Sequence, residues 1–232
     1  MNMDMAPILR ISGLLAIIGA LVYAIGDVLL LASKANLADY PNLQAFAKML
    51  SGAEKMVVLP WRRLFWGGLL GVFATLLVLQ GFWLVFQGLL PAGLWLALAP
   101  VLLFASATVI GAFVHGSFIY LGEYVQALNQ VSAESQPVVA RMFSHHRTVM
   151  AITYGFVAAC VVVASLWYSS LVALGKTIFP AWMAAISPIT VILAWLLIKR
   201  ILPARVRDYT EGAGFNIGYL VFFISVTVAL WQ

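Results

Sequence analysis

Charged residues are scarce in this chain: Asp, Glu, Lys and Arg make up only 9% of it, whereas 64% of its residues are hydrophobic. Soluble globular domains carry about 25% charged residues, so this balance excludes an ordinary soluble fold. Cysteine is scarcer still, with Cys160 alone. One thiol can form neither an intramolecular disulfide nor a cysteine-rich metal site.

Long apolar runs dominate what is present. They cover approximately residues 8–32, 64–89, 94–127, 148–174, 178–198 and 212–231. About 20 apolar residues suffice to cross a hydrocarbon core of about 30 Å. We therefore expect an all-α fold, a polytopic membrane bundle of about six transmembrane helices, forming one domain over residues 1–232 with the lipid bilayer as its partner.

Basic residues predict the orientation of this bundle. The first, third and fifth connections hold Lys34, Lys48, Lys55, Arg62, Arg63, Arg141, Arg147, Lys199, Arg200, Arg205 and Arg207, whereas the opposite side holds Arg10 and Lys176. Lys and Arg concentrate in cytoplasmic loops, so both termini are expected outside the cytoplasm. Topology also explains the net charge of +5, and we expect no nucleic-acid partner.

The first connection carries a second, weaker pattern. After Pro41 and Asn42, the residues Leu43, Phe46, Ala47 and Leu50 recur at helical spacing. This spacing predicts a short amphipathic helix in the first cytoplasmic loop. Such a helix would lie on the membrane surface or cover a pocket as a lid, and the sequence leaves both interpretations open.

The third run, Leu94 to Leu128, is longer than a bilayer requires, so its C-terminal end should project beyond the lipid. At about 100° per residue, one face of this helix is small and polar. That face holds Thr108, Gly111, His115, Ile119, Gly122 and Gln126, with Glu123 on its flank. Such a face is expected to pack against protein rather than lipid.

Ionisable groups inside apolar runs indicate a candidate site. Asp27 lies on a stripe with Gly13, Ala16, Ala20 and Tyr23, the expected packed face of the first run. We predict Asp27, His115 and Glu123 as catalytic acid–base groups, because intramembrane charges are costly and usually functional. Alternatives are a buried hydrogen bond that fixes helix register for Asp27, a satisfied core imidazole for His115, and an interfacial carboxylate for Glu123.

The expected topology places further polar groups on the same, cytoplasmic side. We predict that Arg147, Asn216, Tyr23 and His146 bind substrate, and that Asn216 meets a buried partner such as Asp27. His145 and His146 are adjacent, so on a helix they point about 100° apart and chelate one ion poorly. We expect no metal and no cofactor.

Four short motifs carry a resemblance. They are Gly26-Asp27, Leu59-Pro60-Trp61-Arg62, His115, and Gly214-Phe215-Asn216-Ile217-Gly218. In this combination the chain resembles an uncharacterised family of bacterial six-helix integral membrane proteins. The resemblance covers most of the chain, and it implies a six-helix fold in a bacterial plasma (inner) membrane without an assigned activity.

Two classes of function remain open at this point. One is a membrane-embedded enzyme or binding protein with a cytoplasm-facing polar pocket, which takes a lipid-soluble small molecule and uses acid–base chemistry. The other is a small proton-coupled transporter or channel, for which a homodimer is one arrangement. A structural or accessory membrane subunit is a third interpretation.

Overall fold

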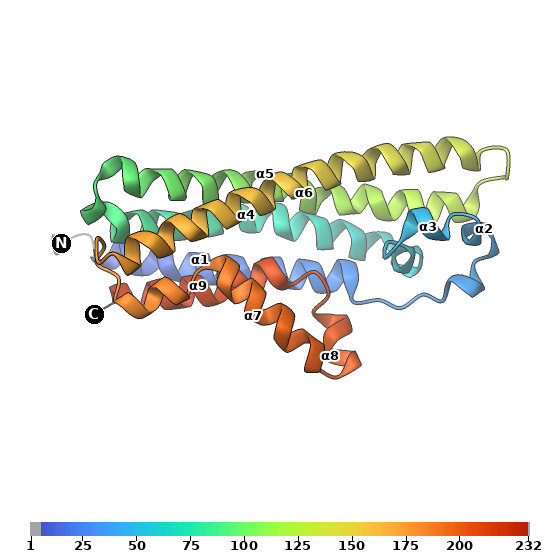
Figure 1. Cartoon of the computed structure of the whole chain (residues 1–232). Coiled ribbons are helices and arrows are strands. Elements are labelled where there is room, and N and C mark those ends of the chain that lie inside the picture. Colours follow the sequence, from blue (N-terminus) through green and yellow to red (C-terminus); the bar gives the residue numbers. More distant parts are fainter. Residues whose placement is uncertain (1–5, 232) are drawn as a thin grey trace.

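The computed structural model describes residues 6–231, and within that range it is helical, without strands. Five long helices lie along one axis (Figure 1): α1 (Ala6–Leu31), α4 (Trp61–Leu89), α5 (Leu94–Gln130), α6 (Gln136–Ala173) and α9 (Gly214–Leu230). The shorter helices are α2 (Pro41–Gln44), α3 (Ala47–Leu50), α7 (Pro188–Ile201) and α8 (Ala204–Tyr209). Single 3-10 turns occur at η2 (Leu37–Asp39), η3 (Glu54–Val58), η4 (Leu90–Ala92) and η5 (Ala181–Ala185).

Four helical segments are long and apolar enough to cross a membrane: α1, α4 with η4, α5 and α6. The all-helical prediction is confirmed in this form. The fifth expected run, residues 178–198, is not one helix, because it divides into η5 and the 14-residue α7 between Pro180 and Ile201. At 1.5 Å per residue, α7 is about 21 Å long, shorter than the hydrocarbon core.

Local signals explain where several helices begin. Pro60 precedes α4 in an extended conformation, and Gly93 precedes α5 with a φ of 102° that favours glycine. Ser187 and Thr190 form a capping box at the start of α7, with Pro188 in the first turn. This cap is the physical reason that the fifth run breaks where it does.

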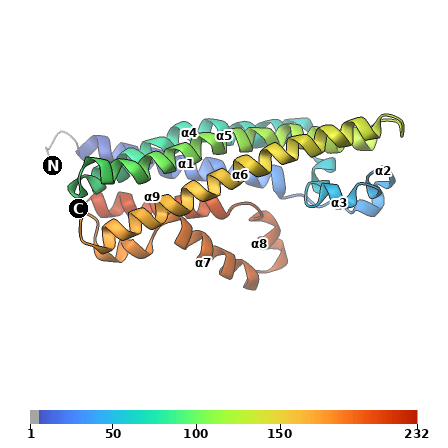
Figure 2. The ribbon, with the colours of Figure 1, turned by 45° about the horizontal axis from the view of Figure 1, so that its top comes forward.

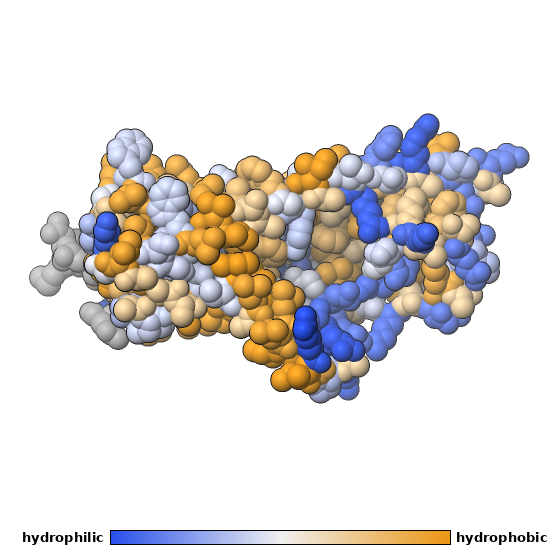
Figure 3. All heavy atoms as spheres, viewed as in Figure 1, coloured by the Kyte–Doolittle hydropathy of each residue, from blue (hydrophilic) through white to orange (hydrophobic). Residues whose placement is uncertain are grey.

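The helices α5 and α6 are much longer than the other elements. They contain 37 and 38 residues, or about 56 Å each, which confirms the expected excess length of the third run. The fourth run was expected to start at residue 148, but α6 begins at Gln136, because its first turns mix apolar residues with charged and polar ones and so interrupt the apolar run. The end that α5 and α6 extend into is hydrophilic (Figure 3).

The first connection does not form one amphipathic helix. It forms the four-residue helices α2 and α3, separated by a break at Phe46. Leu43 and Leu50 are fully buried, and they pack in a cluster with residues of α5 and α6 such as Val125 and Phe143. The prediction of one amphipathic helix is not confirmed, because its apolar residues are covered by protein in two short helices.

A larger apolar cluster fills the bundle toward the end where both termini lie (Figure 1). Its centre, here called the aromatic core, consists of Phe82, Phe104, Tyr168, Tyr219, Phe222 and Phe223. After a 45° turn, α7 and α8 are seen to diverge from the bundle while α9 stays beside α1 (Figure 2). Polar side chains collect between the aromatic core and the hydrophilic end.

Candidate functional site

Three polar side chains from three helices meet in the interior. Asp27 comes from the last turns of α1, His115 from the middle of α5 and Asn216 from the first turn of α9. The Nε2 atom of His115 lies 3.2 Å from Oδ1 of Asp27, and the Asn216 amide donates a hydrogen bond to Oδ2. The predicted contact between Asp27 and Asn216 is confirmed. Oδ2 of Asp27 accepts this hydrogen bond, and Oδ1 faces the imidazole.

The surroundings of His115 show how protons are distributed there. Its Nδ1 atom lies 3.2 Å from the carbonyl oxygen of Gly68, which can only accept, so Nδ1 carries a hydrogen. An unprotonated Nε2 would then face an ionised carboxylate, lone pair against lone pair. A favourable contact between Nε2 and Oδ1 of Asp27 would need a further hydrogen on one of these two atoms.

Close packing of α4 and α1 fixes the imidazole. A Cβ atom at Gly71 would lie 2.3 Å from ring atoms of His115, and one at Gly26 would lie 2.8 Å from its Cε1. Only residues without a side chain permit this approach. The edge of the ring also meets Tyr23, with 5.3 Å between ring centroids, and Tyr23 shares a hydrogen bond with Thr75. The imidazole is held from several sides.

The site lies on the wall of a cavity of about 280 Å³, near the lower limit for small-molecule pockets. Its lining is mostly apolar, from side chains such as Val78, Val157 and Phe215. Thr108 and Tyr219 also line it, are 6% and 9% exposed, and have hydroxyl groups without a hydrogen-bond partner among the described residues. Nε2 of His115 also lacks one, since its contact with Asp27 does not have hydrogen-bond geometry.

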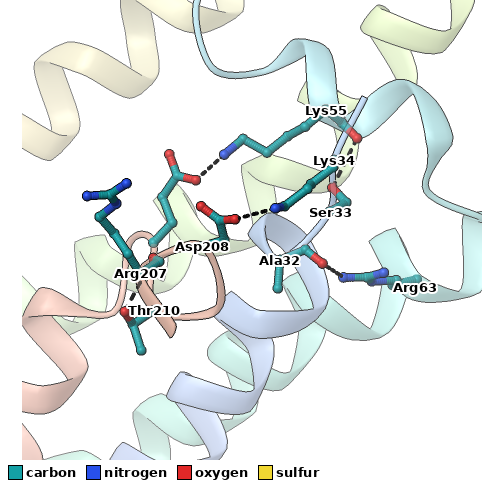
Figure 4. Close-up of polar contacts among 9 residues, drawn as sticks. Ala32, Ser33, Lys34, Lys55, Arg63, Arg207, Asp208 and Thr210 are labelled. Carbon is teal, nitrogen blue, oxygen red and sulfur yellow. Dashed lines mark hydrogen bonds and ion pairs between the residues drawn. The ribbon is translucent and has the colours of Figure 1, made fainter. Parts of the chain in front are cut away.

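The segment between α8 and α9 borders the cavity through Gly212. Gly212 has a φ of 82°, and a Cβ atom there would meet Leu31 at 2.4 Å. Two ion pairs fasten this segment to the region after α1 (Figure 4): Lys55 with Glu211, and Lys34 with Asp208 at 2.7 Å. The hydrogen bond from Lys34 lowers the pKa of the exposed Asp208 carboxyl.

Arg63 fixes the end of α1 from the neighbouring helix α4. Its guanidinium group donates to the carbonyl oxygens of Val28, Leu29 and Ala32, at 3.1, 2.6 and 2.8 Å. Figure 4 shows the bond to Ala32. The Leu29 carbonyl is one that the last turn of a helix leaves unpaired, whereas the Val28 carbonyl also accepts from the Ala32 amide. A cation is favourable at this end of a helix. The turn that carries Asp27 is thereby held in place.

The structure brings four of the seven predicted site residues to this cavity: Asp27, His115, Asn216 and Tyr23. Glu123 is exposed and does not line it, because it lies on the flank of α5. His146 is hydrogen-bonded to the carbonyl oxygen of Ser117 at 3.0 Å, which joins α6 to α5 away from the cavity. Arg147 lines a second, smaller cavity instead.

Sequence reasoning missed several residues of the site. Thr108 lies on the polar face identified for His115, and Tyr219 follows Asn216 by one helical turn, so helical periodicity was a usable signal for both. Gly71 and the Gly68 carbonyl gave no such signal, since their contact with His115 depends on how α4 packs against α5. Across residues 6–231, no three His, Cys, Asp or Glu side chains gather in a way that could hold a metal ion.

Comparison with known proteins identifies a family without assigning a function. No curated protein and no solved structure matches the chain. The family described as a family of unknown function (DUF6796) matches residues 1–232, the whole chain. This chain therefore belongs to the DUF6796 family of unknown function.

Proposed function

We propose that this protein is an integral membrane protein that binds a lipid-soluble small molecule in the cavity beside Asp27 and His115, and exchanges a proton with it. The observation that carries the proposal is the 3.2 Å contact between Nε2 of His115 and Oδ1 of Asp27 at the wall of an apolar cavity, where a proton would be exchanged with the bound molecule. A buried, paired ionisable group inside a long apolar helix is a functional-site candidate by default.

Helix placement supports a six-crossing topology, and we propose that the membrane is a bacterial plasma membrane, as the sequence resemblance implies. The start of α1 and the end of α9 lie at the same end of the bundle (Figure 1), as an even number of crossings requires. In this arrangement η5 with α7, and then α9, supply the fifth and sixth crossings. The distribution of Lys and Arg favours termini outside the cytoplasm, so the cavity opens toward the cytoplasm.

The arrangement suits acid–base chemistry on a bound molecule. Asn216 occupies Oδ2 of Asp27, so the proton is confined to Oδ1 and Nε2 of His115. An oxygen or nitrogen atom of the ligand beside Nε2 would accept that proton or a hydrogen bond. In an apolar cavity such a bond is electrostatically stronger than in water. Thr108 and Tyr219 offer hydroxyl groups to a second polar atom of the ligand.

Packing on the far side of the cavity favours binding over conduction. Tyr219, on the cavity wall, stacks on Phe223 with 5.8 Å between ring centroids, and Phe82 stacks on Phe104 at 5.4 Å. These rings fill the bundle between the cavity and the end where the termini lie. A channel would need polar groups or space along that length.

The test is native mass spectrometry of the protein gently extracted from membranes, with lipid extraction of the same sample. We expect a specific small molecule that is retained by the wild type and lost in Asp27→Asn and His115→Gln. The matched controls are Glu123→Gln, an exposed carboxylate on α5, and His145→Gln, an exposed histidine on α6. Both controls should retain the molecule.

Size-exclusion profiles and unfolding temperatures separate loss of the ligand from loss of the fold. The proposal requires Asp27→Asn and His115→Gln to remain folded while the molecule disappears. Finding only bulk phospholipid, the same in the wild type and all four variants, would refute it and favour transport or a structural role.

A further inference from the structure

A second cavity of about 140 Å³ adjoins the first. The two share the side chains of Leu31 and Phe118. The remaining walls of the smaller cavity come from the end of α3, the turn Ser51–Ala53, Met56 of η3, Leu121 of α5 and Arg147 of α6. The surface is hollowed where the apolar part of the molecule meets the hydrophilic part (Figure 3).

Arg147 is a partly buried cation without a counter-ion. One of its nitrogens donates to the carbonyl oxygen of Met49, which leaves most of its five N–H donors free. Among residues 6–231 no carboxylate pairs with it, whereas Lys34 and Lys55 nearby each have an acidic partner. An unpaired charge in a partly buried place is unfavourable, so a bound anion would stabilise it.

The turn beside Arg147 adds further donors. Gly52 has a φ of 90° and open space around its Cα, and neither its amide nor the Ser51 hydroxyl has a hydrogen-bond acceptor among the described residues. Arg147 is therefore accompanied by one hydroxyl and one amide donor at the same small cavity. A planar guanidinium group with adjacent donors suits an oxyanion such as a carboxylate or a phosphate.

The position of Arg147 along α6 is consistent with contact to the polar headgroup of an amphiphile. From Arg147 to the end of α6 at Ala173 is 173 − 147 = 26 residues, or about 39 Å of helix. The hydrocarbon core is about 30 Å thick. Arg147 thus lies at the level of polar headgroups, and the larger cavity lies on the side of the apolar core.

We infer that the two cavities form one binding site for an anionic amphiphile. Its carboxylate or phosphate headgroup binds Arg147 and the Ser51–Gly52 turn, and its apolar chain passes Leu31 and Phe118 into the larger cavity. A group along the chain then meets Asp27 and His115. The inference rests on the proposed function and adds the class of ligand.

The experiment measures binding to the full-length protein in nanodiscs of neutral lipid, by calorimetry with empty nanodiscs subtracted. The probes are dodecyl phosphate, dodecanol and inorganic phosphate. We expect the wild type to bind dodecyl phosphate at least tenfold more tightly than dodecanol, and inorganic phosphate weakly. Arg147→Gln should weaken dodecyl phosphate about 10- to 100-fold and leave dodecanol unchanged.

Two further variants serve as controls. Arg141→Gln removes an exposed arginine from the same helix, outside both cavities, and should retain the preference for dodecyl phosphate. Arg147→Lys keeps the charge without the planar fork, and should retain part of the preference. Dodecanol binding by Arg147→Gln shows that this variant is folded. If the variant does not fold, the inference is tested by whether the wild type prefers dodecyl phosphate to dodecanol.

Each contrary outcome has a separate meaning. The inference that Arg147 binds an anionic headgroup is overturned by either of two results. One is equal affinity of the wild type for dodecyl phosphate and dodecanol, and the other is a preference for dodecyl phosphate that persists in Arg147→Gln. Inorganic phosphate bound as tightly as dodecyl phosphate would mean that free phosphate is the ligand. If neither chain-bearing probe binds, the inference is overturned. The proposed function is decided separately, because it stands if mass spectrometry finds a small molecule that the wild type retains and His115→Gln loses.

Discussion

The aromatic core and the cavity beside it are built from largely the same helices, yet one is filled and the other is not. In the aromatic core, Phe82 and Phe104 lie 5.4 Å apart with ring planes only 3° from parallel. Close to it, Tyr219 borders a cavity of about 280 Å³. The same bundle therefore has a closely packed section and an open section side by side.

Glycine has the same role in both sections. A Cβ atom at Gly81 would lie 2.5 Å from Phe223, and one at Gly71 would lie 2.3 Å from His115. In each case a helix approaches a ring closely. In the first section the rings are large and fill the space, whereas in the second the polar side chains leave a cavity, with several of their polar atoms unpaired. Side-chain chemistry, rather than helix spacing, separates the two.

The largest effect is expected in the aromatic core. Phe104→Ala removes a fully buried ring, and we expect a loss of about 3 kcal/mol of stability. Phe113→Ala, on the same helix, removes a ring that is 50% exposed and should cost much less. Equilibrium unfolding in mild denaturing detergent measures both. Equal losses would show that close packing does not distinguish this section.

Glycine substitutions in the two sections should have similar effects on stability but different effects on ligand retention. Both Gly71→Ala and Gly81→Ala force an added methyl group onto a ring, and each should cost about 2 kcal/mol. Only Gly71→Ala displaces His115, so it alone should abolish retention of the bound molecule. Gly155→Ala, where a Cβ meets open space, is the control. If Gly71→Ala still retained the bound molecule, binding in the cavity would not depend on the native position of the His115 imidazole.

The end of α1 tests how firmly the open section is held. Arg63→Gln removes a guanidinium group that binds carbonyls of Val28, Leu29 and Ala32. We expect a loss of about 1 to 2 kcal/mol, since a cation is lost from a helix C-terminus. Arg62→Gln, exposed on the preceding residue, should have little effect. Hydrogen exchange of the last turn of α1 would report the loosening.

The smallest effect concerns the ion pair of Lys34 and Asp208. The pKa of Asp208 is lowered in the folded protein by its bond with Lys34, so its contribution is present above about pH 4 and disappears as pH falls through the folded-state value. Wild type should thus lose slightly more stability than Asp208→Asn between pH 5 and about pH 3. If the wild type and Asp208→Asn lost the same free energy of unfolding over this pH range, this prediction would be contradicted.

Sequence reasoning worked where one helix supplied the whole signal. Asp27 and Tyr23 share a packed face of α1, as predicted, and Thr108 and His115 share one of α5. It gave no sign of contacts that side chains make across helices. Arg63 counted only as a basic residue of the first connection, whereas it binds carbonyls of another helix. His146 joins α6 to α5, and its role in binding substrate stays a prediction.

Helix bounds show the same division. Apolar length located α1, α4, α5 and the apolar part of α6, because the cost of leaving backbone groups unpaired in lipid demands long helices. The break before α7 depends on the capping box of Ser187 and Thr190. The first turns of α6 mix charged with apolar residues, and Val139 and Phe143 there pack in the cluster with Leu43 and Leu50. Hydropathy does not report these.

The sequence by itself determined an all-helical protein rich in apolar runs, and it selected Asp27, His115 and Asn216, because charged and polar groups are costly inside such runs. The tertiary structure alone decided that these three meet, that Gly68 orients the imidazole, that Glu123 stays outside, and that two cavities adjoin at Leu31 and Phe118. The physical reason is that helix periodicity fixes which residues share a face, whereas the packing of distant helices fixes which faces meet.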